Sequence, residues 1–389
     1  MNAVKSPAGT EISRKPRVSL RNSSFRDQLG AYLFLSPFLI FLAIFFAYST
    51  GRAFYFSFTD YNLFRDPQWV GFQNYIRLFS QSLFLRALQN TLLFSIIVTT
   101  VQTFLALVMA TVLNQKIRGL GFFRATYYMP SIASSVVITL IFMWMYQRRG
   151  LINYLWTEVS RHAPIIVTFL ILLAMIQFIQ VYVERRRGFP AQWLDPALFV
   201  TSLLLSVLGT LAAWSTGLIA VRRIPPVDFI WLQTRARIPA FFPSFLRLPV
   251  PLVAIMIQNI FTTIPTLMIM YLAALQGVPK SLYEAAQIDG AGRIRQFTNI
   301  TIPSVRPVTF LVVTLSLIGT LQLFDQVAIF GGAVPLESVI TLSYFVYDRM
   351  FPGAQLPQVG LASAAAMFLA FFTLAAVLLQ RLLIKTEVD

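Results

Sequence analysis

The sequence predicts an all-α integral membrane protein with about eight transmembrane helices. Three observations support this class. Of the 389 residues, 57% are hydrophobic. Only 12% are charged, against about 25% in soluble domains. Stretches without any charge, long enough to cross a bilayer, recur along the chain. A chain this apolar cannot hide its surface in a water-soluble fold, which excludes an ordinary soluble enzyme, a disordered protein and a fibrous repeat.

The predicted spans are the windows that contain no Asp, Glu, Lys or Arg. About 20 apolar residues in a helix cross the roughly 30 Å hydrocarbon core. The seventh window is short, and the apolar residues after Asp325 extend it to about residue 330. The eight windows are 28–51, 87–115, 125–147, 162–183, 196–221, 248–279, 307–324 and 350–380.

The basic residues predict the orientation. An even number of spans places both ends of the chain on one side, and the basic tail 1–29 puts that side in the cytoplasm. Eighteen basic residues then lie inside and thirteen outside. The weakest point is 222–247, which places five arginines outside. No A-x-A-like site follows the first apolar run, so we expect an uncleaved anchor. The net charge of +16 is that of a membrane protein and does not indicate a nucleic-acid partner.

The residue inventory argues against an enzyme. Cys is absent and His162 is the single histidine, so no Cys or His metal cluster is available. We expect His162 to lie in a loop, solvated or structural. The chain has neither a G-x-x-x-x-G-K-[ST] nor a G-x-G-x-x-G run, which are the usual phosphate-binding loops. We therefore expect no catalytic residue, no metal and no cofactor.

One polar segment, residues 279–303, differs from the other loops. Ser281 followed by Glu284 has the spacing of a capping box, which predicts a helix starting at Ser281. Asp289 and Gly290 predict its end, because glycine accepts the left-handed conformation at a helix stop. A second short helix is expected to run to Pro303. The residues alone are also compatible with an ordinary amphipathic connector.

The same segment resembles the EAA motif of permease subunits in binding-protein-dependent ABC importers. The longer pattern E-A-A-x-x-D-G-A, followed by Phe297, resembles the MalF-like carbohydrate (sugar) permeases. Ile302 replaces the usual Leu. The matching residues, which the resemblance makes the site of coupling to an ATPase, are Glu284, Ala285, Ala286, Asp289, Gly290, Ala291, Ile300 and Pro303.

The resemblance divides the chain into parts. A six-helix permease core is expected in 30–146 and 248–384, with the coupling loop at 279–303 in the second part. Residues 147–247 form an insert with two extra transmembrane helices. In the second of them, small residues recur at helical spacing and predict a packing face: Ser202, Ser206, Gly209, Ala213 and Gly217. The tails 1–29 and 385–389 are expected in the cytoplasm.

By resemblance, the chain is a pore subunit of an ATP-driven importer in a bacterial or archaeal inner membrane. It would carry a sugar or a related polar solute by alternating access. The implied partners are a second homologous permease, two ABC ATPase subunits that hydrolyse the ATP, and an extracytoplasmic solute-binding protein.

Polar residues within spans are candidates for the solute path, because burying them costs free energy. The alternative is that they hydrogen-bond neighbouring helices only. The candidates lie in the spans on either side of the coupling loop: Gln258, Asn259, Gln322, Asp325 and Gln326.

Other functions remain open on the residues alone. The main alternative is a secondary transporter of a small polar solute with no ATPase partner. Such transporters need no EAA loop and often place charges deep in several spans, whereas Asp325 is almost alone here. A membrane enzyme lacks the clustered side chains it needs, and nothing in the sequence indicates the selectivity filter of a channel.

Overall fold

The computed structural model describes residues 25–115, 119–188, 192–193, 195–239, 243 and 246–384. In this part of the chain, seven helical stretches are long and apolar enough to cross a membrane. An eighth is obtained when a sharply bent pair is taken as one span. The predicted all-α membrane class with about eight spans is therefore confirmed. The seven are Leu29–Ser57, Ser82–Leu113, Leu151–Arg186, Pro196–Ser215, Val250–Gln276, Arg306–Ala333 and Val359–Leu383.

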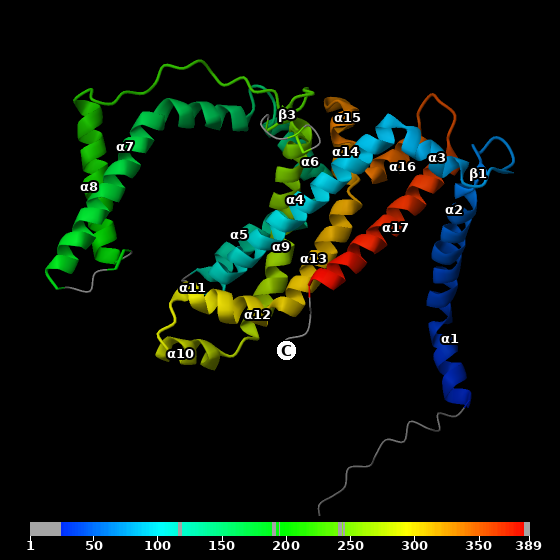
Figure 1. Cartoon of the computed structure of the whole chain (residues 1–389), viewed down its shortest axis with the longest axis horizontal. Coiled ribbons are helices and arrows are strands. Elements are labelled where there is room, and N and C mark those ends of the chain that lie inside the picture. Colours follow the sequence, from blue (N-terminus) through cyan, green and yellow to red (C-terminus); the bar gives the residue numbers. More distant parts are fainter. Residues whose placement is uncertain are drawn as a thin grey trace, which may run out of the picture.

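The first span is a continuous helix made of α1 (Phe25–Phe41), a π-helical stretch (Leu42–Tyr48) and α2 (Ser49–Ser57). A two-stranded hairpin of β1 (Thr59–Asp60) and β2 (Gln68–Trp69) follows, and then α3 (Gln73–Ser80). None of the most apolar 18-residue window of this span is buried. Its α2 part packs on α17 (Val359–Leu383), while α1 stands apart from the bundle (Figure 1).

The core of the bundle lies between α4 (Ser82–Leu113) and α9 (Val250–Gln276), which pack along each other. Small residues such as Ala106 and Ala110 on α4 and large ones such as Tyr271 on α9 are fully buried together. Alternation of small and large side chains brings the two helices close. Helices α13 (Arg306–Leu321) and α17 complete this bundle.

Two predicted spans are broken. The window 125–147 is divided into α5 (Leu120–Ile132) and α6 (Ser135–Met145), which meet at about 100°. The bent pair still provides one span of the predicted eight. Pro130 lies inside α5 and removes a backbone donor near the break. The span after the coupling segment ends at Leu321 and resumes as α14 (Asp325–Phe330) and a 3₁₀ turn (Gly331–Ala333). Extension of that span to about residue 330 agrees with the structure.

The short helices α15 (Leu336–Val339) and α16 (Leu342–Met350) follow and lead into α17. Asn90 of α4 fixes this connection, because its amide donates to the carbonyl oxygens of Glu337 (3.3 Å) and Ile340 (3.1 Å). Phe84 and Phe345 pack edge to face beneath it.

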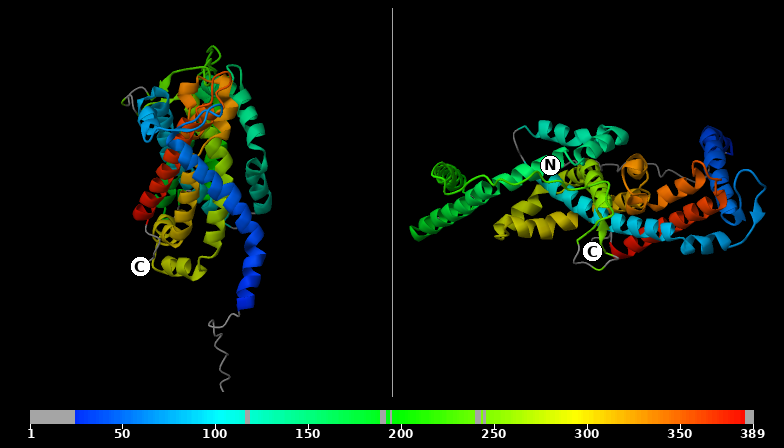
Figure 2. Two further views of the ribbon diagram at one scale, coloured as in Figure 1. Left: turned by 90° about the vertical axis from the view of Figure 1, so that its right-hand side faces the viewer. Right: turned by 90° about the horizontal axis from the view of Figure 1, so that it is seen from above.

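The insert forms a hairpin of α7 (Leu151–Arg186) and α8 (Pro196–Ser215), which stands to one side of the bundle (Figures 1 and 2). Helix α7 begins eleven residues before the predicted span. His162 therefore lies inside a helix, and the expected loop is wrong; its Nδ1 lies 2.8 Å from the carbonyl oxygen of Glu158. Residues 216–249 return to the bundle and end in β3 (Arg237–Ile238) and β4 (Leu248–Pro249).

The two ends of the bundle carry different parts. The lower end in Figure 1 holds the start of α1, the end of α7, the start of α8 and the end of α17. It also holds the segment made of α10 (Lys280–Ile288), α11 (Arg293–Gln296), a π-helical turn (Phe297–Thr301) and α12 (Ile302–Ser304). The upper end holds α3, the return segment 216–249 and α14 to α16. The predicted tails at 1–24 and 385–389, with Lys116 and Arg118, lie outside the described residues.

Candidate functional sites: the coupling segment and a polar cavity

The coupling segment starts differently from the prediction. Helix α10 begins at Lys280 with Pro279 as its N-cap, and no side chain makes a capping hydrogen bond. The predicted capping box of Ser281 and Glu284 is therefore wrong. Proline fixes its own φ in the range a helix start requires. The helix thus starts one residue early, and Ser281 lies within the first turn, where its hydroxyl cannot act as the cap.

The end of α10 agrees with the prediction. Gly290 has φ of +74°, a conformation that residues with a side chain rarely adopt. Its N–H donates to the carbonyl of Gln287 at 3.0 Å, and the N–H of Ala291 donates to the carbonyl of Ala286 at 2.8 Å. These two bonds form a Schellman motif, which satisfies the last free carbonyls of the helix and reverses the chain.

Side-chain contacts hold the two arms of the segment at a fixed angle. The Tyr283 hydroxyl lies 3.0 Å from the Thr301 hydroxyl, which joins α10 to the second arm. The amide of Gln296 donates to the carbonyl of Ala291 at 2.8 Å. A cavity of about 180 Å³ remains between the arms, lined by Ala286, Asp289, Ala291, Arg295, Gln296, Asn299 and Ile300.

The outer surface of this segment is more apolar than a solvent-facing loop requires. Ile288 is 87% exposed and Ile294 is 82% exposed. No residue of α10 is buried, and Glu284 and Ala285 are fully on the surface. Exposed large apolar side chains on a rigid, charged segment are typical of a protein contact surface.

A second candidate site is a polar cavity of about 230 Å³ in the bundle. It lies where the chain breaks between α13 and α14, next to α9 and the start of α6. Four of the five predicted path residues line it, although they come from two helices 60 residues apart in the chain. The lining consists of Ser135, Asn259, Gly319, Gln322, Leu323, Phe324, Asp325 and Gln326.

The amides around this cavity are only partly engaged. The Asn259 amide nitrogen donates to Oε1 of Gln326 at 3.2 Å, and Gln326 is 7% exposed. Gln322 and Asp325 are exposed. Hydrogen-bonding groups beside an aromatic ring suit a hydroxyl-rich solute.

Gln258 is separated from the other four. It is 1% exposed, and its amide nitrogen donates to the Thr139 hydroxyl of α6 at 2.6 Å. Its Oε1 is buried with no hydrogen-bond partner among the described residues. This contact with α6 is a hydrogen bond between neighbouring helices, which is the alternative to a solute contact for polar residues within spans.

Sequence reasoning missed Ser135 and Gly319 in the cavity and a set of hydroxyls beside it. The Thr320 hydroxyl lies 2.9 Å from that of Ser95 and 3.1 Å from that of Thr99, and joins α13 to α4. Small polar residues one helical turn apart within a span are the signal that could have indicated this contact.

Comparison with known proteins identifies the family. Residues 119–386 match the family described as "Binding-protein-dependent transport system inner membrane component". Two similar proteins are the probable ABC transporter permease protein YurN of Bacillus subtilis, 27% identical over 93% of this chain and 98% of YurN, and the lactose transport system permease protein LacF of Rhizobium radiobacter, 26% identical over 83% and 84%.

The sn-glycerol-3-phosphate transport system permease protein UgpA of Salmonella typhimurium is 24% identical over 89% of this chain and 91% of UgpA. Among solved structures, a chain of a bacterial ABC transporter that imports the acidic polysaccharide alginate superposes with a TM-score of 0.61 at 20% identity, covering 94% of this chain and 97% of that one. This likeness shows a shared fold. The family match covers most of the chain and favours a permease that works with a binding protein over a secondary transporter. This protein belongs to the family of inner-membrane components of binding-protein-dependent transport systems.

Proposed function

We propose that the chain is the membrane-spanning subunit of an ATP-driven sugar importer, and that the polar cavity lies on the solute path. The relatives named for lactose and sn-glycerol-3-phosphate transport support a polar, hydroxyl-bearing solute. The cavity contributes amides, the Asp325 carboxylate and the Phe324 ring, which are the groups that bind sugars. Asn259, Gln322, Asp325 and Gln326 contact the solute, whereas Gln258 joins α9 to α6.

The ATP-driven mechanism is supported by the structure of the coupling segment. Its two arms are joined by the Tyr283–Thr301 hydrogen bond, and no residue of α10 is buried. An ATPase subunit that receives Ile288 and Ile294 in a cleft would move the segment as one body. The motion would reach the bundle through Pro303 and α13, since the second arm runs directly into that helix. Glu284, Ala285, Ala286, Asp289, Gly290, Ala291, Ile300 and Pro303 form this coupling surface, and two ATPase subunits serve the assembled importer.

We propose that the second permease binds against the first span. Helix α1 stands apart from the bundle, and no residue of the most apolar window of this span or of the π-helical stretch is buried. A homologous permease offers the complementary face. The lower end is cytoplasmic, both termini lie on the cytoplasmic side, and a solute-binding protein docks at the upper end. The division into core parts 30–146 and 248–384 with the insert 147–247 belongs to the same proposal.

The test is to co-express the chain with candidate ATPases and to measure solute-stimulated ATP hydrolysis and uptake. Ala286→Arg should abolish both, because Ala286 lines the cavity between the arms, where Arg295 already places a positive charge. Gly290→Pro should do the same, since proline cannot adopt φ of +74°. Membrane insertion should be unchanged in both variants.

The matched control is Gly217→Pro, which makes the same backbone change at φ of +76° outside the coupling segment. Uptake per inserted molecule should survive in this variant. If the two coupling-segment variants kept solute-stimulated hydrolysis and uptake, the coupling role would be refuted.

A further inference from the structure

The insert dominates the charge of the upper end. Its two upper segments, 148–161 and 216–249, carry eight arginines and two acidic residues. The remaining upper segments, 52–86 and 322–358, carry five arginines and five acidic residues. The whole net positive charge at this end, +6, therefore comes from the insert. Such a concentration of one sign attracts anions into a nearby concave site.

Most of these arginines lack an acidic partner within the described residues. Arg148 pairs with Asp228 at 2.8 Å and Arg161 with Glu158 at 2.9 Å. Arg149 and Arg235 are exposed and make no ion pair in the described part. Arg237 lies near Arg86, and both burial and that like charge lower the pKa of the Arg237 guanidinium. Two neighbouring guanidiniums without a counter-charge favour an anion between or beside them.

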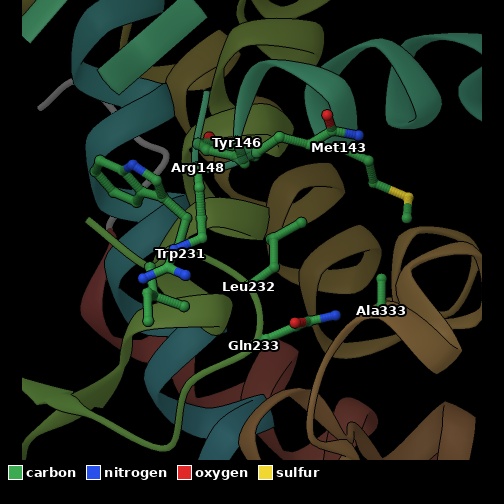
Figure 3. A pocket seen from close by; sticks show the side chains of 9 residues that line it. Met143, Tyr146, Arg148, Trp231, Leu232, Gln233 and Ala333 are labelled. Atoms are coloured by element: carbon green, nitrogen blue, oxygen red, sulfur yellow. The ribbon is translucent and has the colours of Figure 1, made fainter. Parts of the chain in front are cut away.

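A cavity of about 390 Å³ lies where the insert meets the bundle (Figure 3), and its lining includes Arg148. Its walls come from the end of α6, from the return segment and from the turn that follows α14. The cavity falls in the size range of small-molecule sites. The side chains that matter for a ligand are Tyr146, Gln147, Arg148, Trp231 and Gln233.

The aromatic wall of this cavity is held in place by hydrogen bonds. The indole nitrogen of Trp231 donates to Asn153 Oδ1 at 2.9 Å, and the Tyr146 hydroxyl donates to the carbonyl of Ala254 at 3.0 Å. Asn153 also donates to the carbonyl of Phe229 at 2.8 Å. The ring of Trp231 packs 5.5 Å from that of Tyr146. A ligand would thus meet a surface that is already formed.

The polar wall is available to a ligand. Gln147 and Gln233 are exposed, and in the described residues their side-chain amides bond to no protein group. Amides match sugar hydroxyls, an aromatic face matches the C–H face of a sugar ring, and guanidinium groups match a carboxylate. The amides and the aromatic face line this cavity together with Arg148, which pairs with Asp228. The exposed Arg149 and Arg235 lie one and two residues along the chain from the lining residues Arg148 and Gln233.

We propose that this cavity is an entry site for an acidic saccharide, a sugar that carries a carboxylate. The arginines of the insert draw the anion in, Trp231 takes the sugar face, and Gln147 and Gln233 bond its hydroxyls. The proposal rests on the proposed sugar import and narrows its solute class. An acidic lobe of a binding protein would need a broad surface and would not depend on the cavity side chains.

The test is calorimetric titration of the full chain in nanodiscs of phosphatidylcholine, with trigalacturonate as probe and maltotriose as the uncharged control. Trigalacturonate should bind and maltotriose should bind much more weakly. Arg235→Gln with Arg237→Gln should weaken trigalacturonate binding by about tenfold, as expected for two partly exposed charges. Gln147→Ala with Gln233→Ala, an exposed pair, should weaken it by about the same factor.

The control is Arg77→Gln with Arg65→Gln, which removes two exposed arginines at the upper end but away from β3 (Figure 1). It should leave binding unchanged. Equal affinity for maltotriose, equal loss in this control, or binding insensitive to the two glutamines would overturn the proposal, the last pointing to a surface for an acidic protein. These outcomes leave the ATPase-coupling test untouched, so the entry site and the proposed function can fail separately.

Discussion

At the scale of residues, two adjacent amide side chains have different environments and therefore different proposed roles. Gln258 and Asn259 follow each other on α9, and consecutive residues of a helix point about 100° apart. One therefore meets Thr139 on α6, and the other faces the polar cavity. The sequence predicts that both are important because both lie in a span. The family resemblance favours Asn259, with Gln322, for the solute path, but the span itself does not separate the two amides, because the side on which α6 packs is decided by the break between α5 and α6.

Replacing each amide by alanine should give opposite results. Asn259→Ala should lower the uptake rate at limiting solute by about three- to tenfold, the value of one lost hydrogen bond, with little change in thermal stability. Gln258→Ala should lower stability by about 1–3 kcal/mol, because it removes a buried contact between two helices. Uptake kinetics and thermal unfolding of the solubilised importer measure both effects.

The pair serves as its own control, since the chemical change is the same at neighbouring positions. Unchanged uptake in Asn259→Ala would remove that residue from the solute path.

At the scale of elements, a sequence signal predicts the structure correctly where the residues of that segment alone set the backbone conformation. The Gly290 turn agrees with prediction because positive φ depends on that residue alone. The predicted capping box fails because Pro279, just outside it, starts the helix first. The small face of α8 packs on α7, with Ser202 and Ser206 fully buried. Gly217 was predicted on that face, but it lies beyond the end of α8 at Ser215 with φ of +76° and terminates the helix.

The hairpin packing can be tested by disulfide trapping, which is clean because the chain has no cysteine. The Ser202 hydroxyl donates to Gln180 Oε1 at 3.0 Å. The double variant Gln180→Cys with Ser202→Cys should therefore cross-link on mild oxidation. Gln180→Cys with Leu204→Cys should remain reduced, because Leu204 is 56% exposed and points away from α7. The readout is a mobility shift on denaturing gels that reductant reverses.

Equal cross-linking of both pairs would mean that α7 and α8 slide or rotate against each other. The packing of Gly209 against Leu172, where an added Cβ would lie 3.1 Å from the leucine side chain, would then be lost as well.

At the scale of the whole molecule, the arrangement of the spans explains the charge count. The segments predicted inside gather at the lower end, and those predicted outside gather at the upper end (Figure 1). The five arginines of 222–247, unexplained by the orientation rule, lie on the return segment, whose residues 230–233 line a cavity. The proposed entry site would give this charge excess a local role.

The proposed orientation predicts the labelling of single cysteines in right-side-out vesicles. Ser80→Cys, exposed at the end of α3, should react with a membrane-impermeant maleimide. Gln287→Cys, exposed on α10, should react only after the vesicles are opened. Labelling in the reverse order would place the coupling segment outside and rule out contact with a cytoplasmic ATPase.

The sequence by itself determined the class, the approximate number of spans, and the helix of the segment 279–303 with its turn at Gly290. Each depends on hydrophobic length, on charge position or on the backbone freedom of a single residue. Tertiary structure decided which amide lines the polar cavity, where α5 and α6 bend, and that the insert stands beside the bundle and brings Arg148 and Trp231 to a second cavity. These features depend on contacts between residues far apart in the chain, such as Gln258 with Thr139 and Trp231 with Asn153. The sequence of one segment does not show where its distant partner segment lies in space.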